Sequence, residues 1–184
     1  LGSADVALLT AWLRRPEVSA TLTRTCLLNN PLGEGVNEII KVFEETPRLR
    51  TLCGFEEGVE QIDWKDSGKG PADVALLSAE LRVGRAVAAL NSLTVDSTGV
   101  PKLTSGLSHE VDASGPRTYT LTGKELDLSF KNLGSTDLTL VVGWLGTDAG
   151  AAVYEVNVSM NPIGVDGAKA LGNVICGSSL KCLI

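Results

Sequence analysis

The sequence repeats itself, and this repetition limits the possible folds more than any other feature of the chain. Residues 4–13 read ADVALLTAWL, residues 72–81 read ADVALLSAEL, and residues 136–145 hold a more diverged copy, TDLTLVVGWL. A second motif, NPLG at residues 30–33, recurs as NPIG at residues 161–164. The chain therefore contains a long repeat of 131 to 132 residues, which is itself built from shorter units. Such periodicity is typical of proteins in which each unit packs on its neighbours.

The shorter unit has the pattern L-x-x-L-x-L-x-x-N-x-L-G and is followed by a helical stretch. It fits residues 22–33 and 153–164, and weaker copies run through residues 59–67, 90–98 and 126–134. Within each unit the last apolar positions alternate with polar ones, as in a β-strand. A turn follows, and then apolar residues return at helical spacing. Each unit is thus predicted to form one strand, one turn and one helix.

These residues and their register resemble leucine-rich repeats, and the unit length and helical second half are similar to the ribonuclease-inhibitor-like subclass. The resemblance covers nearly the whole chain. It implies an α/β fold, a horseshoe-shaped solenoid with parallel inner strands and outer helices. Residues 1–184 are expected to form a single segment of this leucine-rich-repeat solenoid, uncapped at both ends.

The resemblance also implies that the Asn of each repeat hydrogen-bonds backbone groups of the neighbouring loop. Asn30 and Asn161 fit this role. The same slot holds Ser67, Thr98 and Lys131 in the weaker copies. Ser and Thr can serve in part, but Lys has no acceptor, so a local irregularity is expected at Lys131.

Two segments interrupt the regular spacing of the repeats. Residues 49–55 and 59–64 both have the pattern of strands and are separated by only three residues. Residues 98–126 show no helical pattern and contain several Gly and Pro residues, with a strand-like segment at 118–121. We predict an irregular β insertion near 99–121, a loop plus hairpin that replaces a helix. Such an insertion is either functional or a tolerated surface feature.

Composition and charge exclude several classes of protein. The net charge is −6 and the longest basic cluster is Arg14-Arg15, which argues against a nucleic-acid partner. No run of about 18 apolar residues is present, so no membrane insertion is expected. Residues 1–5 lack both a Met and the layout of a signal peptide and begin within a repeat, which suggests a fragment or a processed product.

The four cysteines, at positions 26, 53, 176 and 182, form no CxxC pair, and His109 is the only histidine. A structural zinc site is therefore not expected. Two disulfides are possible, but reduced thiols are favoured, and with them an intracellular location.

The chain lacks the residue patterns that catalysis requires. No Ser or Cys is placed beside His109 by any sequence feature, and neither a phosphate-binding loop nor a dinucleotide-binding glycine motif occurs. We expect a protein that is not an enzyme and that has no cofactor and no metal.

The candidate binding surface is the concave strand face of the expected solenoid. Outward-pointing positions of the strands carry the acids Asp63, Asp96, Glu125, Asp127 and Glu155. They favour docking of a basic or polar segment of another protein, although an ordinary solvated face has the same pattern. Toward the N-terminal end the face is more apolar, with Leu28 and Phe55, and is either a contact site or covered by further repeats.

Two functions fit these features. The first is a non-enzymatic protein–protein interaction module that binds one partner reversibly through the strand face. The alternative is a structural scaffold subunit that is permanently embedded in a larger multiprotein assembly. Trp12 and Trp144, which occupy matching positions of the long repeat, are expected to be core residues rather than interface anchors.

Overall fold

The computed structural model describes residues 3–99, 116–175 and 180–184. Within these ranges, helices and strands alternate along the chain. Their bounds are α1 Ser3–Leu13, α2 Pro16–Ser19, the 3-10 helix η1 Gly33–Gly35, α3 Val36–Glu45, β1 Gln61–Asp63, α4 Pro71–Val83, β2 Ser92–Asp96, β3 Thr118–Leu121, β4 Glu125–Asp127, α5 Ser135–Leu145, the 3-10 helix η2 Gly150–Ala152, β5 Glu155–Asn157, α6 Gly164–Ile175 and β6 Cys182–Leu183.

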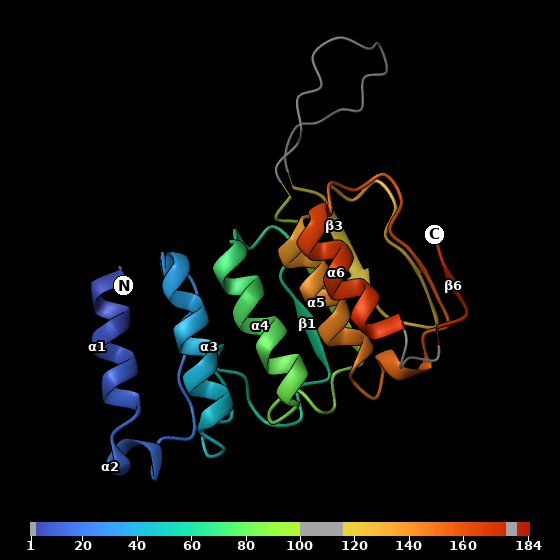
Figure 1. Cartoon of the computed structure of the whole chain (residues 1–184). Helices are drawn as coiled ribbons and strands as arrows, with labels where there is room; N and C mark the ends of the chain where they lie inside the picture. Colours follow the sequence, from blue (N-terminus) through green and yellow to red (C-terminus); the bar gives the residue numbers. More distant parts are fainter. Residues whose placement is uncertain (1–2, 100–115, 176–179) are drawn as a thin grey trace.

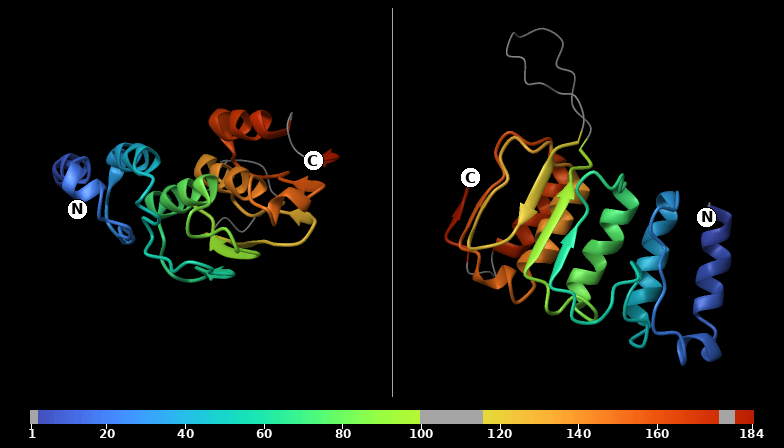
Figure 2. Two further views of the ribbon diagram at one scale, coloured as in Figure 1. Left: turned by 90° about the horizontal axis from the view of Figure 1, so that it is seen from below. Right: turned by 180° about the vertical axis from the view of Figure 1, so that it is seen from behind.

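The five longer helices stand side by side in a row, from α1 at one end to α6 at the other (Figure 1). Seen from below and from behind, the helices lie on one side of the molecule and the strands on the other (Figure 2). Helix α5 packs against both α4 and α6, and α3 packs against both α1 and α4. Helix α1, at the end of the row, has a neighbouring helix of the row on only one flank.

The strands form two separate sheets of three strands each. In the first sheet β2 is central, with β1 parallel to it on one side and β3 antiparallel on the other. The second sheet is parallel throughout, in the order β4-β5-β6. Nearer the N-terminus, Thr25 and Leu27 donate backbone hydrogen bonds to the carbonyls of Thr51 and Leu52, which joins these two short extended segments.

The molecule is α/β, but the predicted leucine-rich-repeat solenoid is wrong. That fold requires one continuous parallel inner sheet, whereas the described strands form a mixed sheet and a parallel sheet without a ladder between them. The physical reason lies in β3, which runs antiparallel to β2 and so ends the first sheet. The chain then turns at Gly123, with φ of +75°, and enters β4 of the second sheet.

The interruptions predicted from sequence have mixed outcomes. The strand-like segment 118–121 is indeed a strand, β3, while residues 100–115 of the predicted insertion lie outside the described residues. Of the two strands predicted at 49–55 and 59–64, the second contains β1, and the first forms only isolated bridges with residues 24 and 26.

Leu and Val side chains between helices and strands make up most of the buried core. Its largest fully buried side chains are Trp144, Tyr119 and Phe43. The prediction of a core position is confirmed for Trp144 and wrong for Trp12, whose side chain is 44% exposed. The difference follows from position in the row, because α5 lies between α4 and α6 while α1 stands at the end.

Two buried carboxylates start helices and tie them to distant turns. Asp73 accepts hydrogen bonds from the backbone N–H of Gly70 at the start of α4 and from that of Asn29, 44 residues earlier. Asp137 does the same at α5 with the N–H groups of Gly134 and Thr98. A carboxylate at this position satisfies the free amides of a helix N-terminus.

Asparagine side chains connect the loops, although not at every expected position. Asn161 donates to the carbonyls of Leu128, Val158 and Ser159 and accepts from the N–H of Leu133, so it joins two loops. At the irregular position, the neighbour of Lys131 takes part instead: Asn132 donates to the carbonyl of Gly99 over 2.7 Å. The irregularity expected at Lys131 is therefore a displacement of the asparagine by one residue.

Candidate functional site

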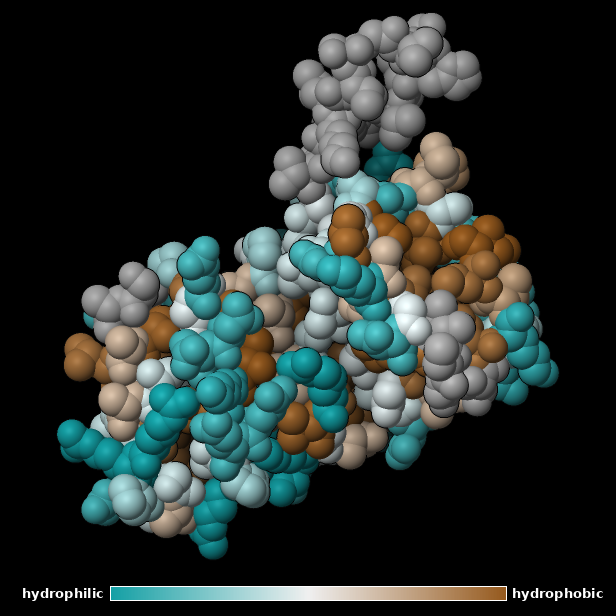
Figure 3. Space-filling view, in the orientation of Figure 1, coloured by the Kyte–Doolittle hydropathy of each residue, from teal (hydrophilic) through white to brown (hydrophobic). Residues whose placement is uncertain are grey.

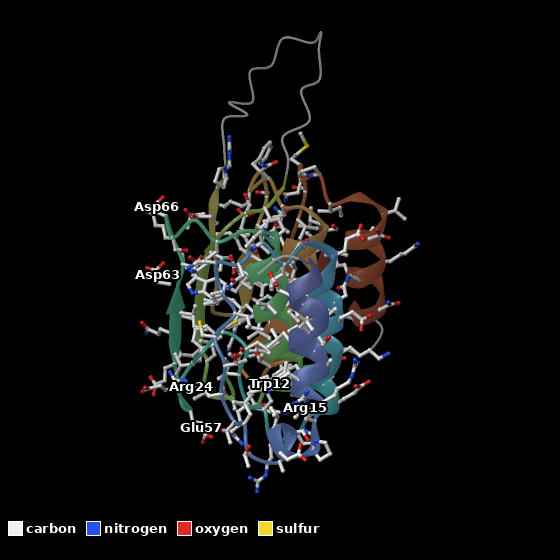
Figure 4. The ribbon with its side chains drawn as sticks, turned by 90° about the vertical axis from the view of Figure 1, so that its left-hand side faces the viewer. Trp12, Arg15, Arg24, Glu57, Asp63 and Asp66 are labelled. Carbon is white, nitrogen blue, oxygen red and sulfur yellow. The ribbon has the colours of Figure 1, made fainter. Side chains whose placement is uncertain are left out.

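The outer face of the two sheets carries the acidic residues that the sequence singles out. Asp63 alternates with the buried Ile62 on β1, and Glu125 and Asp127 flank the buried Leu126 on β4. Figure 4 shows Asp63 and Asp66 on the strand side of the molecule, away from the helices. The side chains of Asp63, Glu125 and Asp127 are exposed, whereas those of Asp96 and Glu155 are half-buried. The strands thus place acids on the surface but in two separate groups, one on each sheet.

Three strands end in the same kind of turn, in which an Asp or Asn side chain accepts a hydrogen bond from the backbone two residues later. Asp63 accepts from Lys65 N over 2.9 Å, and Asn157 from Ser159 N over 3.0 Å. Asp127 accepts from both N and Oγ of Ser129, which lowers the pKa of its carboxyl. These side chains shape the turns that lead away from the strands.

Asp96, at the end of β2, also has a structural role. Its Oδ2 accepts from the N–H of Asp66 in the turn after β1, and its Oδ1 accepts from Oγ of Thr118 on β3, each over 2.7 Å. One carboxylate therefore connects all three strands of the first sheet. Asp63, Asp96 and Asp127 already have hydrogen-bond partners within the chain, which reduces what they can offer to a binding partner.

Glu125 and Glu155 differ from the other three acids because neither closes a turn. They are direct neighbours in the register of the parallel strands β4 and β5, and Glu155 is in turn paired with Cys182 on β6. Glu125 is exposed and Glu155 half-buried. The hydroxyl of Tyr154 donates to Oε1 of Glu125, and this hydrogen bond to the carboxylate raises the pKa of Tyr154. We call Glu125, Glu155 and Tyr154 the acidic pair site.

Leu28 and Phe55, the apolar candidates, are half-buried and pack against the core. The ring of Phe55 stacks on that of Trp64, with 6.2 Å between centroids and 26° between planes. The ammonium group of Lys69 lies 5.7 Å from the centre of the Trp64 ring. Phe55 is therefore held by contacts within the chain.

The sequence did not single out Glu80, the most deeply buried glutamate among the described residues. Its Oε1 accepts from Oγ of Thr51 and from the N–H groups of Leu52 and Cys53, over 2.8, 2.5 and 2.6 Å. Its Oε2 has no partner, and burial raises the pKa of this carboxyl. A signal was present, since Glu80 is a charged residue at the position where the other two copies of the repeat have Trp12 and Trp144.

The three cysteines among the described residues differ in burial. Cys26 is exposed, Cys182 is half-buried and Cys53 is buried, all three as free thiols. Burial and the nearby Glu80 carboxylate raise the pKa of Cys53 well above its usual value, whereas a nucleophilic thiol needs a lowered one. His109 and Cys176 lie outside the described residues. In the part of the chain that the structure describes, no three His, Cys, Asp or Glu side chains are grouped to hold a metal ion.

Among the described residues, no helix is both long enough and apolar enough to span a membrane. No protein-family model and no curated protein matches the chain. The site is therefore interpreted from its own geometry, in which two adjacent carboxylates on parallel strands stand beside a tyrosine hydroxyl.

Proposed function

We propose that this chain is a non-enzymatic protein-binding module, and that it docks a basic segment of another protein on the acidic pair site. The observation that carries the proposal is the register of β4 and β5, which sets Glu125 directly beside Glu155. Neighbouring strands are about 4.8 Å apart, so the two side chains leave the sheet close together.

Within the part of the chain that the structure describes, no cation forms an ion pair with either glutamate. Like charges on adjacent strands repel each other, and this repulsion is relieved when a cation lies between them. A lysine or arginine side chain of a partner supplies such a cation. Glu125 and Glu155 can bind it without disturbing a turn, because neither side chain closes one.

The surroundings of the pair suit an extended polypeptide. Asn157 and Ser159, which follow Glu155 on the outward-facing positions, are half-buried polar residues. Tyr154 adds an aromatic ring with a polar end, a side chain that is common in protein interfaces. The polar side chains and the paired negative charges on this face favour recognition of a basic segment over catalysis.

The proposal is tested with a fluorescent peptide of alternating lysine and serine, titrated with the full chain at low salt and followed by fluorescence anisotropy. The double variant Glu125→Gln/Glu155→Gln should weaken binding by roughly tenfold, the combined effect of two exposed ion pairs. The matched control Asp63→Asn changes an acid of the first sheet and should leave binding nearly unchanged. Equal affinities of the wild-type chain and the double variant would refute the site.

A further inference from the structure

The exposed large apolar side chains of the described residues gather mainly at the two ends of the row of helices. Leu8 and Trp12 are exposed on α1, and Met160, Val165, Leu183 and Ile184 are exposed around α6 and β6. Phe130 lies beside the second group, because its backbone N–H donates to the carbonyl of Ser159, the residue before Met160. In the view of Figure 3 apolar surface reaches the outside at both ends. We call the first group the α1 face and the second group the β6 end.

The α1 face is a copy of a surface that is covered elsewhere in the same molecule. Residues 4–9 and 72–77 have the identical sequence ADVALL, so Leu8 corresponds to Leu76 and Trp12 to Glu80 of α4. Leu76 and Glu80 are both almost completely buried, whereas Leu8 is 73% exposed. The difference arises because α4 has α3 on one flank and α5 on the other, while α1 has only α3 beside it.

The structure shows which segments cover this surface on α4. One is the turn before α3, where the N–H of Asn29 donates to Asp73 over 2.7 Å. The other is the extended segment 51–53, where the N–H groups of Leu52 and Cys53 donate to Glu80. Both covering segments come from the unit that contains α3 or directly follows it.

The β6 end carries copies of both covering segments. At an offset of 131 residues, Met160 corresponds to Asn29, and the two share the left-handed backbone conformation, with φ of 58° and 60°. At the same offset Leu183 and Ile184 correspond to Leu52 and Cys53. Met160 is 68% and Ile184 is 56% exposed. The molecule thus presents a covering surface at one end and the matching covered surface at the other.

We infer that the α1 face binds the β6 end of a second copy of this chain, in a head-to-tail contact that reproduces the contact between α3 and α4. In this contact the N–H of Met160 lies at Asp5, as the N–H of Asn29 lies at Asp73. The Trp12 side chain packs on Leu183 and Ile184, in place of the hydrogen bonds that Glu80 makes to Leu52 and Cys53. The pairing is of unlike surfaces, so each added copy leaves one end open and association continues beyond the dimer.

The inference is tested by analytical ultracentrifugation of the full chain over a wide range of concentration. The average mass should rise with concentration and pass beyond that of a dimer. One variant, Leu8→Glu, changes the α1 face, and a second variant, Met160→Glu/Ile184→Glu, changes the β6 end. Each alone should lower the association constant by roughly tenfold or more, because it puts a charge into an apolar contact. Gln61→Glu, which adds one negative charge at an exposed position of β1, away from both ends, is the matched control and should associate like the wild type.

Mixing the two variants distinguishes a head-to-tail contact from a contact between two identical surfaces. Each variant retains one intact end, so an equimolar mixture should form a 1:1 dimer and nothing larger. Trp12→Ala provides a second change of the α1 face, and circular dichroism confirms that each variant is folded. A wild-type chain that stays monomeric at all concentrations overturns the inference. So does a β6-end variant that still dimerises with itself while Leu8→Glu does not, because that result indicates pairing of two α1 faces.

Discussion

The two sheets of this molecule use their acidic side chains in different ways. In the first sheet Asp63 shapes a turn and Asp96 binds groups from both neighbouring strands. In the second sheet Asp127 shapes a turn as well, but Glu125 and Glu155 stand side by side with no such role. Acids that look alike in the sequence therefore differ in role: the aspartates of both sheets have structural hydrogen bonds, whereas the two glutamates of the second sheet are, in our proposal, available for binding. Length contributes to this difference, because an Asp side chain reaches the backbone two residues on more easily than a Glu side chain.

The largest effect is expected at Asp137, in the first turn of α5. It accepts hydrogen bonds from Gly134 and Thr98 and from the hydroxyl of the buried Tyr119 on β3. Asp137→Ala leaves several buried donors without a partner and should lower the free energy of unfolding by about 3 kcal/mol or more. Urea denaturation measures the loss. Asp137→Asn keeps one carbonyl oxygen and should lose less; equal losses would show that the hydrogen bonds do not carry the effect.

A second prediction concerns the pH dependence of stability at Glu80. Because burial raises the pKa of Glu80, the folded chain holds this proton more tightly than the unfolded chain does. The contribution of Glu80 to stability is therefore fully present below the pKa of a glutamate in the unfolded chain, about 4.3. It is lost as the pH rises through the higher pKa that Glu80 has in the folded chain. Glu80→Gln cannot titrate. The unfolding free energy of this variant minus that of the wild type should therefore increase as the pH is raised from about 4.5 to 7.

Denaturation at several pH values follows this difference. The control Glu38→Gln makes the same substitution at an exposed glutamate of α3, which burial does not desolvate. A Glu80→Gln difference that varies with pH no more than the difference for the control would contradict the assigned cause.

A smaller effect on stability compares an aspartate of the first sheet with an aspartate of the second. Asp96→Ala removes two hydrogen bonds that connect β2 to its neighbours and should cost about 1–2 kcal/mol of stability. Asp127→Ala removes bonds within a single exposed turn and should cost less. Thermal unfolding of both variants measures the two losses of stability. A larger loss for Asp127→Ala would contradict our inference that Asp96 contributes more to stability than Asp127.

The repeats predicted the helices better than the sheets. The three copies at 4–13, 72–81 and 136–145 lie within α1, α4 and α5, because their apolar spacing directly encodes a helix with buried faces. The alternation of polar and apolar residues also gave the outward positions of β1 and β4. It contains no information on strand direction, so it could not show that 118–121 runs antiparallel to β2 and ends the first sheet.

The candidate site was predictable in orientation but not in hydrogen bonding. The outward direction of Asp63, Glu125 and Asp127 followed from the period of the strand. Their different roles depend on the turns that follow, in which Asp63 and Asp127 bond to residues two positions later. The burial of Glu80 depended on contact with residues 51–53, nearly thirty positions away, which no local pattern reveals.

The smallest expected effect on stability is at the acidic pair site, and the same variants test its function. Glu125→Lys/Glu155→Lys should leave the unfolding free energy within about 0.5 kcal/mol of the wild type, because these side chains close no turn. Circular dichroism in urea checks this value. A clearly larger loss would mean that the pair is structural, like the acids of the first sheet.

The most direct test of the account is the affinity of the lysine–serine peptide for this double lysine variant, measured by fluorescence anisotropy beside the wild-type chain and Asp63→Lys. We predict that binding to the wild type weakens as salt is added, that it is abolished by Glu125→Lys/Glu155→Lys, and that it is largely retained by Asp63→Lys. Binding that survives reversal of both glutamates, or that is lost equally with Asp63→Lys, would contradict the central claim that the second sheet holds the docking site.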